Sequence, residues 1–144
     1  MKPTIYYSHP IAGKVGVGGN LQDYSYENKN CQTAIENVKI LRRIFPQVNW
    51  YCPGEVEIPL QTARKLNLLD VPQVLSIDFH VIKTLCCAVV LHRWEDSNGV
   101  DREEKVAEQL EYPKIKLTKS IHIWECDLEK VQNLVDCVLK KYRN

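Results

Sequence analysis

The 144-residue chain has no marked excess of charge of either sign, because 19 lysines and arginines face 18 aspartates and glutamates, a formal net charge of +1. A near-neutral chain gives no electrostatic support for binding a nucleic-acid polymer or an anionic membrane. The sequence also has no apolar run of transmembrane length, and its first residues, MKPTIYYSHPIAG, lack the apolar stretch of a secretory signal peptide. We therefore expect a small-molecule substrate, with no nucleic-acid polymer and no membrane as partner.

Paired cysteine motifs are absent as well. The six cysteines, at positions 31, 52, 86, 87, 126 and 137, form no CxxC pair, and zinc-binding spacing is missing. A disulfide framework belongs to a secreted context, which nothing in the sequence indicates. We therefore expect reduced thiols in a cytoplasmic protein that holds no metal.

Glycine is scarce outside one segment, since four of the six glycines lie between His9 and Asn28. This segment is interpreted as a loop. Its GKVGVGG stretch suggests a phosphate-binding loop, but it lacks both the Gly-Lys-Ser/Thr ending and the GxGxxG spacing, so a flexible loop is the interpretation we prefer.

The rest of the chain alternates between strand and helix patterns. Apolar residues such as Val38 and Leu41 recur at helical spacing, whereas the continuous apolar run Cys87–His92 is typical of a strand in a parallel sheet. Strands are expected at Thr4–Tyr7, Val48–Cys52, Cys87–His92, Lys114–Leu117 and Ser120–Trp124, and helices at Asn30–Phe45, Ile58–Leu66, Gln73–Leu85, Val100–Leu110 and from an N-cap at Asp127 onward. With 44% apolar and 26% charged residues, this pattern predicts one α/β domain over residues 1–144. The expected architecture is a doubly wound, flavodoxin-like or Rossmann-like three-layer sandwich with about five mainly parallel strands.

Two segments reach the edge of such a sheet where ligands bind, beyond the carboxyl ends of the strands. One follows the first strand at Tyr6–Ile11, and the other follows the central strand at Trp94–Glu103. Ser97 and the amides near Gly99 can hold an anion or a sugar hydroxyl at a helix start. Glu103 lies about one turn further, where the positive helix end favours its carboxylate form, which suits a nucleophile. The alternative is that Ser97–Gly99 is an ordinary turn and Glu103 an ordinary acidic residue of a first helical turn.

Four segments carry a resemblance to a known family: IYYSHPIAG, IDFHVIKTLCCAVVL, RWEDSNGVDREEKVA and HIWECDLEKVQNLVDCVLKKY. In this order, and over nearly the whole chain, they resemble the nucleoside 2-deoxyribosyltransferase superfamily. The similarity is greatest to its small phage and bacterial members and extends to the deoxynucleoside 5′-monophosphate N-glycosidases. The chain departs from the glycosidases at Tyr112–Lys114, where they carry a longer loop that reaches a neighbouring subunit. It departs from the family again at Cys86-Cys87, where Cys-Asp is common.

The resemblance implies roles for individual residues. Glu103, rather than Glu104, matches the family's nucleophile, and Asp78 matches the acidic residue that positions or protonates the nucleotide. The remaining matches are the turn that holds the 5′ end of the sugar (Ser97, Asn98 and Gly99) and the first-loop wall of the site (Tyr6, His9 and Pro10). Asp78 could instead be a solvated helix residue, and Tyr6 and His9 could be wall or core residues without chemistry.

The activity implied by the resemblance is cleavage or transfer of the N-glycosidic bond of a 2′-deoxynucleoside or its 5′-monophosphate, through a covalent deoxyribosyl–enzyme. It needs no cofactor, and the family resemblance suggests a homo-oligomer. The alternative from another class is a non-catalytic module that binds a nucleotide or a nucleotide-derived signal. A flavin-binding domain of similar fold is a third reading, but the sequence lacks its phosphate-loop signature.

Overall fold

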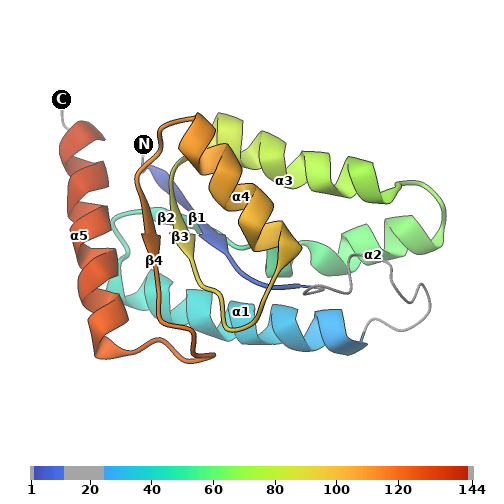
Figure 1. Cartoon of the computed structure of the whole chain (residues 1–144), viewed down its shortest axis with the longest axis horizontal. Coiled ribbons are helices and arrows are strands. Elements are labelled where there is room, and N and C mark those ends of the chain that lie inside the picture. The colour runs from blue at the N-terminus through green and yellow to red at the C-terminus, as the bar shows by residue number, and fades with distance from the viewer. Residues whose placement is uncertain (1, 12–24, 143–144) are drawn as a thin grey trace.

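A four-stranded, all-parallel sheet forms the centre of the molecule in the computed structural model, which describes residues 2–11 and 25–142 (Figure 1). The strands are β1 (Thr4–Ser8), β2 (Asn49–Tyr51), β3 (Cys86–Leu91) and β4 (Lys114–Lys116), in the order β2-β1-β3-β4. The helices are α1 (Ser25–Ile44), α2 (Glu57–Lys65), α3 (Val71–Leu85), α4 (Asn98–Gln109) and α5 (Glu125–Tyr142), with a short 3-10 helix η1 (Pro53–Glu55) after β2. The described residues therefore form a mixed α/β fold of the Rossmann-like kind. The GKVGVGG stretch lies outside them.

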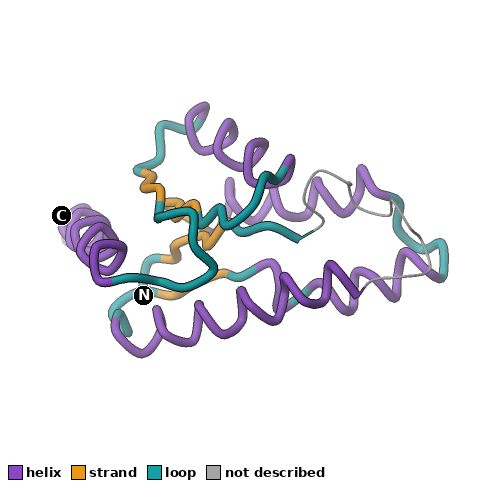
Figure 2. The backbone as a smooth tube through the Cα atoms, turned by 60° about the horizontal axis from the view of Figure 1, so that its bottom comes forward, coloured by secondary structure: helices purple, strands orange, loops and turns teal. Residues whose placement is uncertain are grey.

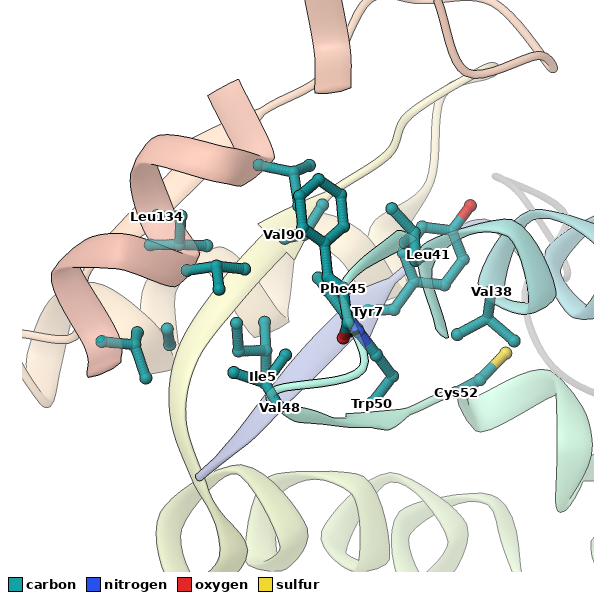
Figure 3. Close-up of a cluster of buried hydrophobic side chains, with 14 of the residues drawn as sticks. Ile5, Tyr7, Val38, Leu41, Phe45, Val48, Trp50, Cys52, Val90 and Leu134 are labelled. Carbon is teal, nitrogen blue, oxygen red and sulfur yellow. Dashed lines mark hydrogen bonds between the residues drawn. The ribbon is translucent and has the colours of Figure 1, made fainter. Parts of the chain in front are cut away.

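Helices cover both faces of the sheet (Figure 2). Successive side chains of a strand point to opposite faces and therefore pack against different helices. Ile5 and Tyr7 pack with α1 and α5, whereas Tyr6 packs with α3 and α4. Figure 3 shows the first of these two cores, where Ile5, Tyr7 and Val90 of the strands meet side chains of α1 and Leu134 of α5. The face that Tyr6 occupies is the one on which the candidate site lies.

Helix starts follow local capping rules. Asp70 caps α3 by accepting a hydrogen bond from the amide of Gln73 at 2.8 Å, and the Gln73 side chain accepts one from the Asp70 amide at 2.8 Å. Ser97 caps α4 with a single hydrogen bond, which its hydroxyl accepts from the amide of Val100 at 3.2 Å. The cap at Ser97 fixes where α4 begins and therefore which of its residues face the sheet.

The strand expected at Ser120–Trp124 is wrong, so the described sheet has four strands rather than about five. The pattern was misleading because Ile121, which alternates with Ile123, is exposed rather than packed on a sheet face. Side chains, not a neighbouring strand, hold this backbone: Ser120 Oγ accepts from the amide of His122 at 3.3 Å, and Asp127 Oδ2 accepts from the amide of Trp124 at 3.0 Å.

The starts of two helices differ most from expectation. Helix α5 begins at Glu125, so Asp127 is its third residue and not its N-cap. Helix α1 begins at Ser25, so the end of the expected loop up to Asn28 is helical. None of the described helices is both long and apolar enough to cross a lipid bilayer.

Asp127 fastens the segment between β4 and α5, and its removal gives the first testable prediction. Its carboxylate is buried and accepts hydrogen bonds from the amide and the hydroxyl of Thr118, each at 2.8 Å, besides that from Trp124. Because hydrogen bonds to charged groups are strong, we expect Asp127→Asn to lower the free energy of unfolding by roughly 2 kcal/mol. Urea denaturation of the variant and the wild type measures this difference.

Asp136→Asn is the matched control on the same helix. Asp136 is exposed and accepts one hydrogen bond, from Gln132 at 2.9 Å, so its loss should change the unfolding free energy by less than about 0.5 kcal/mol. Equal effects of the two substitutions would contradict the role given to Asp127.

Candidate active site

A buried carboxyl group, that of Glu103, lies at the centre of the candidate site. Its Oε2 accepts a hydrogen bond from the hydroxyl of Tyr6 at 2.5 Å, and its Oε1 accepts one from the hydroxyl of Ser8 at 2.8 Å. Tyr6 and Ser8 are two residues apart on β1 and therefore point to the same face of the sheet, the face that α4 covers. Both oxygens of Glu103 are thus fixed by the central part of the sheet.

Asp78 brings a second carboxyl group to the same place. Asp78 lies on α3, which runs beside α4 (Figure 1). It interacts electrostatically with both Glu103 and Tyr6. Its Oδ1 atom is buried and has no hydrogen-bond partner among the described residues. The expected pairing of Asp78 with Glu103 is therefore present in the structure, although the two residues come from different helices.

Burial controls the ionisation of this pair. Removal from water raises the pKa of Glu103 above its ordinary value, and the nearby Asp78 carboxyl raises it further, whereas the hydrogen bonds from Tyr6 and Ser8 offset only part of the rise. Burial likewise raises the pKa of Asp78. The positive end of α4 would favour the carboxylate form of Glu103, but desolvation outweighs this effect. One of the two acids therefore keeps a proton near neutral pH, an arrangement suited to acid–base chemistry.

The start of α4 is less closely tied to this pair. Ser97 is buried and its hydroxyl caps the helix, Asn98 is exposed, and no hydrogen bond joins either of them to Glu103 or Asp78 within the described residues. Gly99 has no steric reason to be glycine, since an added Cβ would meet only the Ser97 hydroxyl oxygen, at 3.7 Å. A side chain at position 99 is therefore sterically tolerated by the described residues.

His9 does not join the site. It leaves β1 on the Tyr7 side, where its Nδ1 donates to the carbonyl of buried Pro10 at 2.9 Å and its Nε2 accepts from the amide of Gly54 at 3.0 Å. Its ring stacks on that of Trp94, with centroids 6.1 Å apart. Burial lowers the pKa of His9 to about 4, so the ring is neutral at physiological pH. His9 and Pro10 thus tie the end of β1 to η1, while Tyr6 alone of the first-loop wall contacts Glu103.

Three residues of the site were not anticipated from the sequence. Ser8 could have been found, because it lies two positions after Tyr6 in an extended run. Tyr51 pairs in register with Tyr6 on the neighbouring strand, and their rings stack with centroids 5.4 Å apart at 24°. Glu57 at the start of α2 interacts electrostatically with Asp78, and no local sequence signal indicates that proximity.

A buried ion triad supports Glu57. Arg64 Nη2 lies 2.7 Å from Glu57 Oε1 and 3.2 Å from Glu27 Oε2, and these three side chains are almost completely covered. Burial raises the pKa of Glu57 to about 8, although Arg64 draws it downward. The acidic side of the site thus extends from Glu103 through Asp78 to this triad.

Comparison of the chain with models of known protein families, with curated proteins and with solved structures found no match. Among the described residues, no group of three or more His, Cys, Asp or Glu side chains is arranged to hold a metal ion. What the described residues do offer chemically is a buried pair of carboxyl groups, two hydroxyl donors that orient one of them, and an aromatic side wall.

The burial of Glu103 predicts a pH dependence of stability. Its pKa is higher in the folded chain than the ordinary value of 4.5, so the folded state binds more protons than the unfolded one. The stability contributed by the protonated carboxyl is complete below the unfolded pKa and is lost as the pH rises through the folded pKa. Relative to Glu103→Gln, which cannot ionise, the wild type should lose roughly 2 kcal/mol of unfolding free energy between pH 5 and pH 8.5. Urea denaturation of both proteins at the two pH values measures this.

Glu104→Gln is the control for neighbouring charge. Partial burial raises the pKa of Glu104, but the hydrogen bonds from Lys114 and Lys116 outweigh it and leave the pKa below its ordinary value. The wild type should therefore not lose stability relative to this variant as the pH rises. If Glu103→Gln and Glu104→Gln gave the same pH dependence, burial of the Glu103 carboxyl would not be the cause.

Proposed function

We propose that this protein is an enzyme that cleaves or transfers the N-glycosidic bond of a 2′-deoxynucleoside or its 5′-monophosphate, with Glu103 as the nucleophile. The observation that carries the proposal is the buried Glu103 carboxyl, held at both oxygens by Tyr6 and Ser8. It interacts electrostatically with Asp78, one oxygen of which has no hydrogen-bond partner among the residues that the structure describes. A carboxyl group held in this way is suited to attack at a sugar carbon.

The fold supports the same proposal. The strand order β2-β1-β3-β4 matches the first four strands of the flavodoxin-like, doubly wound order, and the chain reverses direction across the sheet between β1 and β3. Ligands of such sheets bind at this reversal, beyond the carboxyl ends of the strands. Tyr6 and Ser8 belong to β1, and β3 leads through Arg93–Asp96 to the start of α4.

The reaction divides into two displacements. In the first, an oxygen of ionised Glu103 forms a bond to C1′ of the sugar while the bond from C1′ to the base nitrogen breaks, and protonated Asp78 gives its proton to the departing base. In the second, water or a second base attacks C1′ and gives its proton to the Asp78 carboxylate, while the bond from C1′ to Glu103 breaks and Glu103 leaves as a carboxylate, as in retaining glycosidases. Deoxyribose favours this route, because it lacks the electron-withdrawing 2′-hydroxyl that would destabilise positive charge at C1′.

The side chains around Glu103 have distinct parts in these steps. Each of its oxygens accepts one hydrogen bond and keeps a further lone pair, so Tyr6 and Ser8 orient the nucleophile without blocking it. The attack proceeds from the form of the pair in which Glu103 is negative and Asp78 holds the proton. Mutual repulsion favours a single negative charge on the pair, and the hydrogen bonds from Tyr6 and Ser8 stabilise that charge when it lies on Glu103. The pair therefore supplies nucleophile and acid together.

Removal of the nucleophile tests the proposal directly. Glu103→Ala should lower the rate of base release by roughly 10³-fold or more, because it removes the carboxylate that forms the sugar ester. Chromatography of reactions with a panel of 2′-deoxynucleosides and their 5′-monophosphates, with and without a second free base, measures release and transfer. Circular dichroism checks that the variant is folded.

Glu104→Ala is the matched control one position along. The Glu104 carboxylate forms ion pairs with Lys114 and Lys116, at 2.7 and 3.2 Å, and faces away from the site. Its replacement should lower the rate by less than about tenfold. Near-normal turnover by Glu103→Ala would refute the assignment, and absence of turnover by the wild type with every substrate would favour a binding module.

Gly99→Ala separates a ligand-binding role of the α4 start from a structural one. Because the added Cβ meets only the Ser97 hydroxyl oxygen, at 3.7 Å, the variant should be at least as stable as the wild type. If the 5′ end of the sugar approaches the first-turn amides, kcat/KM should nevertheless fall about tenfold or more, as for the loss of a well-placed contact. Lys105→Ala, an exposed change on the same helix, is the control, and unchanged turnover by Gly99→Ala would remove Ser97–Gly99 from the site.

A further inference from the structure

Tyr51 is an aromatic residue at the candidate site that the proposed chemistry does not use. It is the last residue of β2, at the edge of the described sheet, and lies in register beside Tyr6 of β1. The two rings stack with centroids 5.4 Å apart. Tyr6 is completely buried, whereas Tyr51 is half-buried. The accessible aromatic surface of this pair therefore belongs to Tyr51.

The position of Tyr51 is set by the same groups that form the site. The Tyr6 hydroxyl is fixed on Glu103 Oε2 at 2.5 Å, so the ring on which Tyr51 stacks is immobilised by the nucleophile. The Tyr51 hydroxyl interacts electrostatically with Asp78 and Glu103, and burial together with these carboxyls raises the pKa of Tyr51 well above its usual range. Tyr51 is therefore neutral, and its hydroxyl makes no hydrogen bond to a described residue.

We propose that Tyr51, backed by Tyr6, is the wall on which the planar base of the substrate stacks, and that it determines affinity for the base. The identity of the ligand rests on the proposed function. The base is bonded to the carbon that Glu103 attacks, so a planar group must lie within one bond of that carbon. Tyr51 is half-buried and stacks on Tyr6, whose hydroxyl donates to the nucleophile. Stacking on an aromatic ring tolerates different bases and is greater for purines than for pyrimidines because more area is covered.

If Tyr51 had only a structural role, replacing another aromatic residue of the same apolar cluster should affect nucleoside binding equally. Tyr112 is the residue chosen for this comparison. Tyr112 packs partly buried against the same apolar cluster, and its hydroxyl donates to the carbonyl of Lys83 at 3.3 Å. It follows α4, at the opposite end of that helix from Ser97. Replacing Tyr112 removes aromatic packing from this face without changing the candidate site.

The experiment compares Tyr51→Leu, Tyr51→Phe and Tyr112→Leu with the wild type. Leucine keeps apolar bulk but loses the flat ring, and phenylalanine keeps the ring without the hydroxyl. KM and kcat are measured for 2′-deoxyadenosine and 2′-deoxycytidine, and Kd for both by titration calorimetry. Tyr51→Leu should raise KM and Kd for 2′-deoxyadenosine about tenfold or more, and less for 2′-deoxycytidine, while kcat changes by less than about threefold. Tyr51→Phe should restore near-normal values, and Tyr112→Leu should leave them unchanged.

The outcomes separate this inference from the proposed function. Wild-type Kd values for Tyr51→Leu, or an equal loss in Tyr112→Leu, would overturn the role of Tyr51. If the wild type binds 2′-deoxyadenosine without releasing adenine, the proposed function fails, and the comparison of Kd values still decides the role of Tyr51. If the wild type neither binds nor cleaves either nucleoside or its 5′-monophosphate, both proposals are overturned.

Discussion

The contact on which the candidate site depends is the pair of hydrogen bonds that β1 donates to Glu103. A carboxyl group loses several kcal/mol of hydration when it is buried, and the hydroxyls of Tyr6 and Ser8 offset part of that loss by occupying both of its oxygens. The loss that remains appears as the raised pKa. The same two bonds join the middle of the sheet to α4, so the position of the helix and the orientation of the carboxyl are set together.

The buried Glu27–Arg64–Glu57 triad extends this charge arrangement to α1 and α2. A buried ion pair is weak support for stability, because desolvation of the ions can exceed their attraction, whereas removing one partner leaves an uncompensated charge. Here the triad joins two helices and places a paired carboxylate near Asp78. Its cation is held between two acids and does not neutralise the Asp78–Glu103 pair. The side of the site towards α2 is therefore acidic.

Local patterns predicted the helices and the parallel strands well, since helix stripes, caps and apolar runs depend on neighbours in the sequence. Local patterns could not exclude the strand expected at Ser120–Trp124. The amide of Trp124 donates to the side chain of Asp127, which also binds Thr118 in the preceding loop, and no local sequence pattern indicates these contacts. The meeting of Asp78 with Glu103 was anticipated from the family resemblance and the sheet-edge rule. The separation of His9 from Tyr6 follows from alternation along β1 and could have been anticipated too. The presence of Glu57 and Tyr51 at the site could not have been anticipated from the sequence. Glu57 lies on α2 and Tyr51 on β2, and only the packing of these elements brings them to the site.

Charge also bears on whether the substrate carries a 5′-phosphate. Beside Asp78 and Glu57 a phosphate would meet acidic side chains rather than a cation, because Arg64 is already bound by Glu27 and Glu57. Lys114, beyond α4, is likewise engaged by Glu104 and Glu108, each at 2.7 Å. The first turn of α4 differs, because the helix end is positive and an added Cβ at Gly99 would meet only the Ser97 hydroxyl oxygen. If the substrate of the proposed reaction carries a 5′-phosphate, the start of α4 at Ser97–Gly99 is the positive helix end beside this site, more than one helical turn from Glu103. That separation would suit a 5′ group on a sugar whose C1′ faces the Glu103 carboxylate.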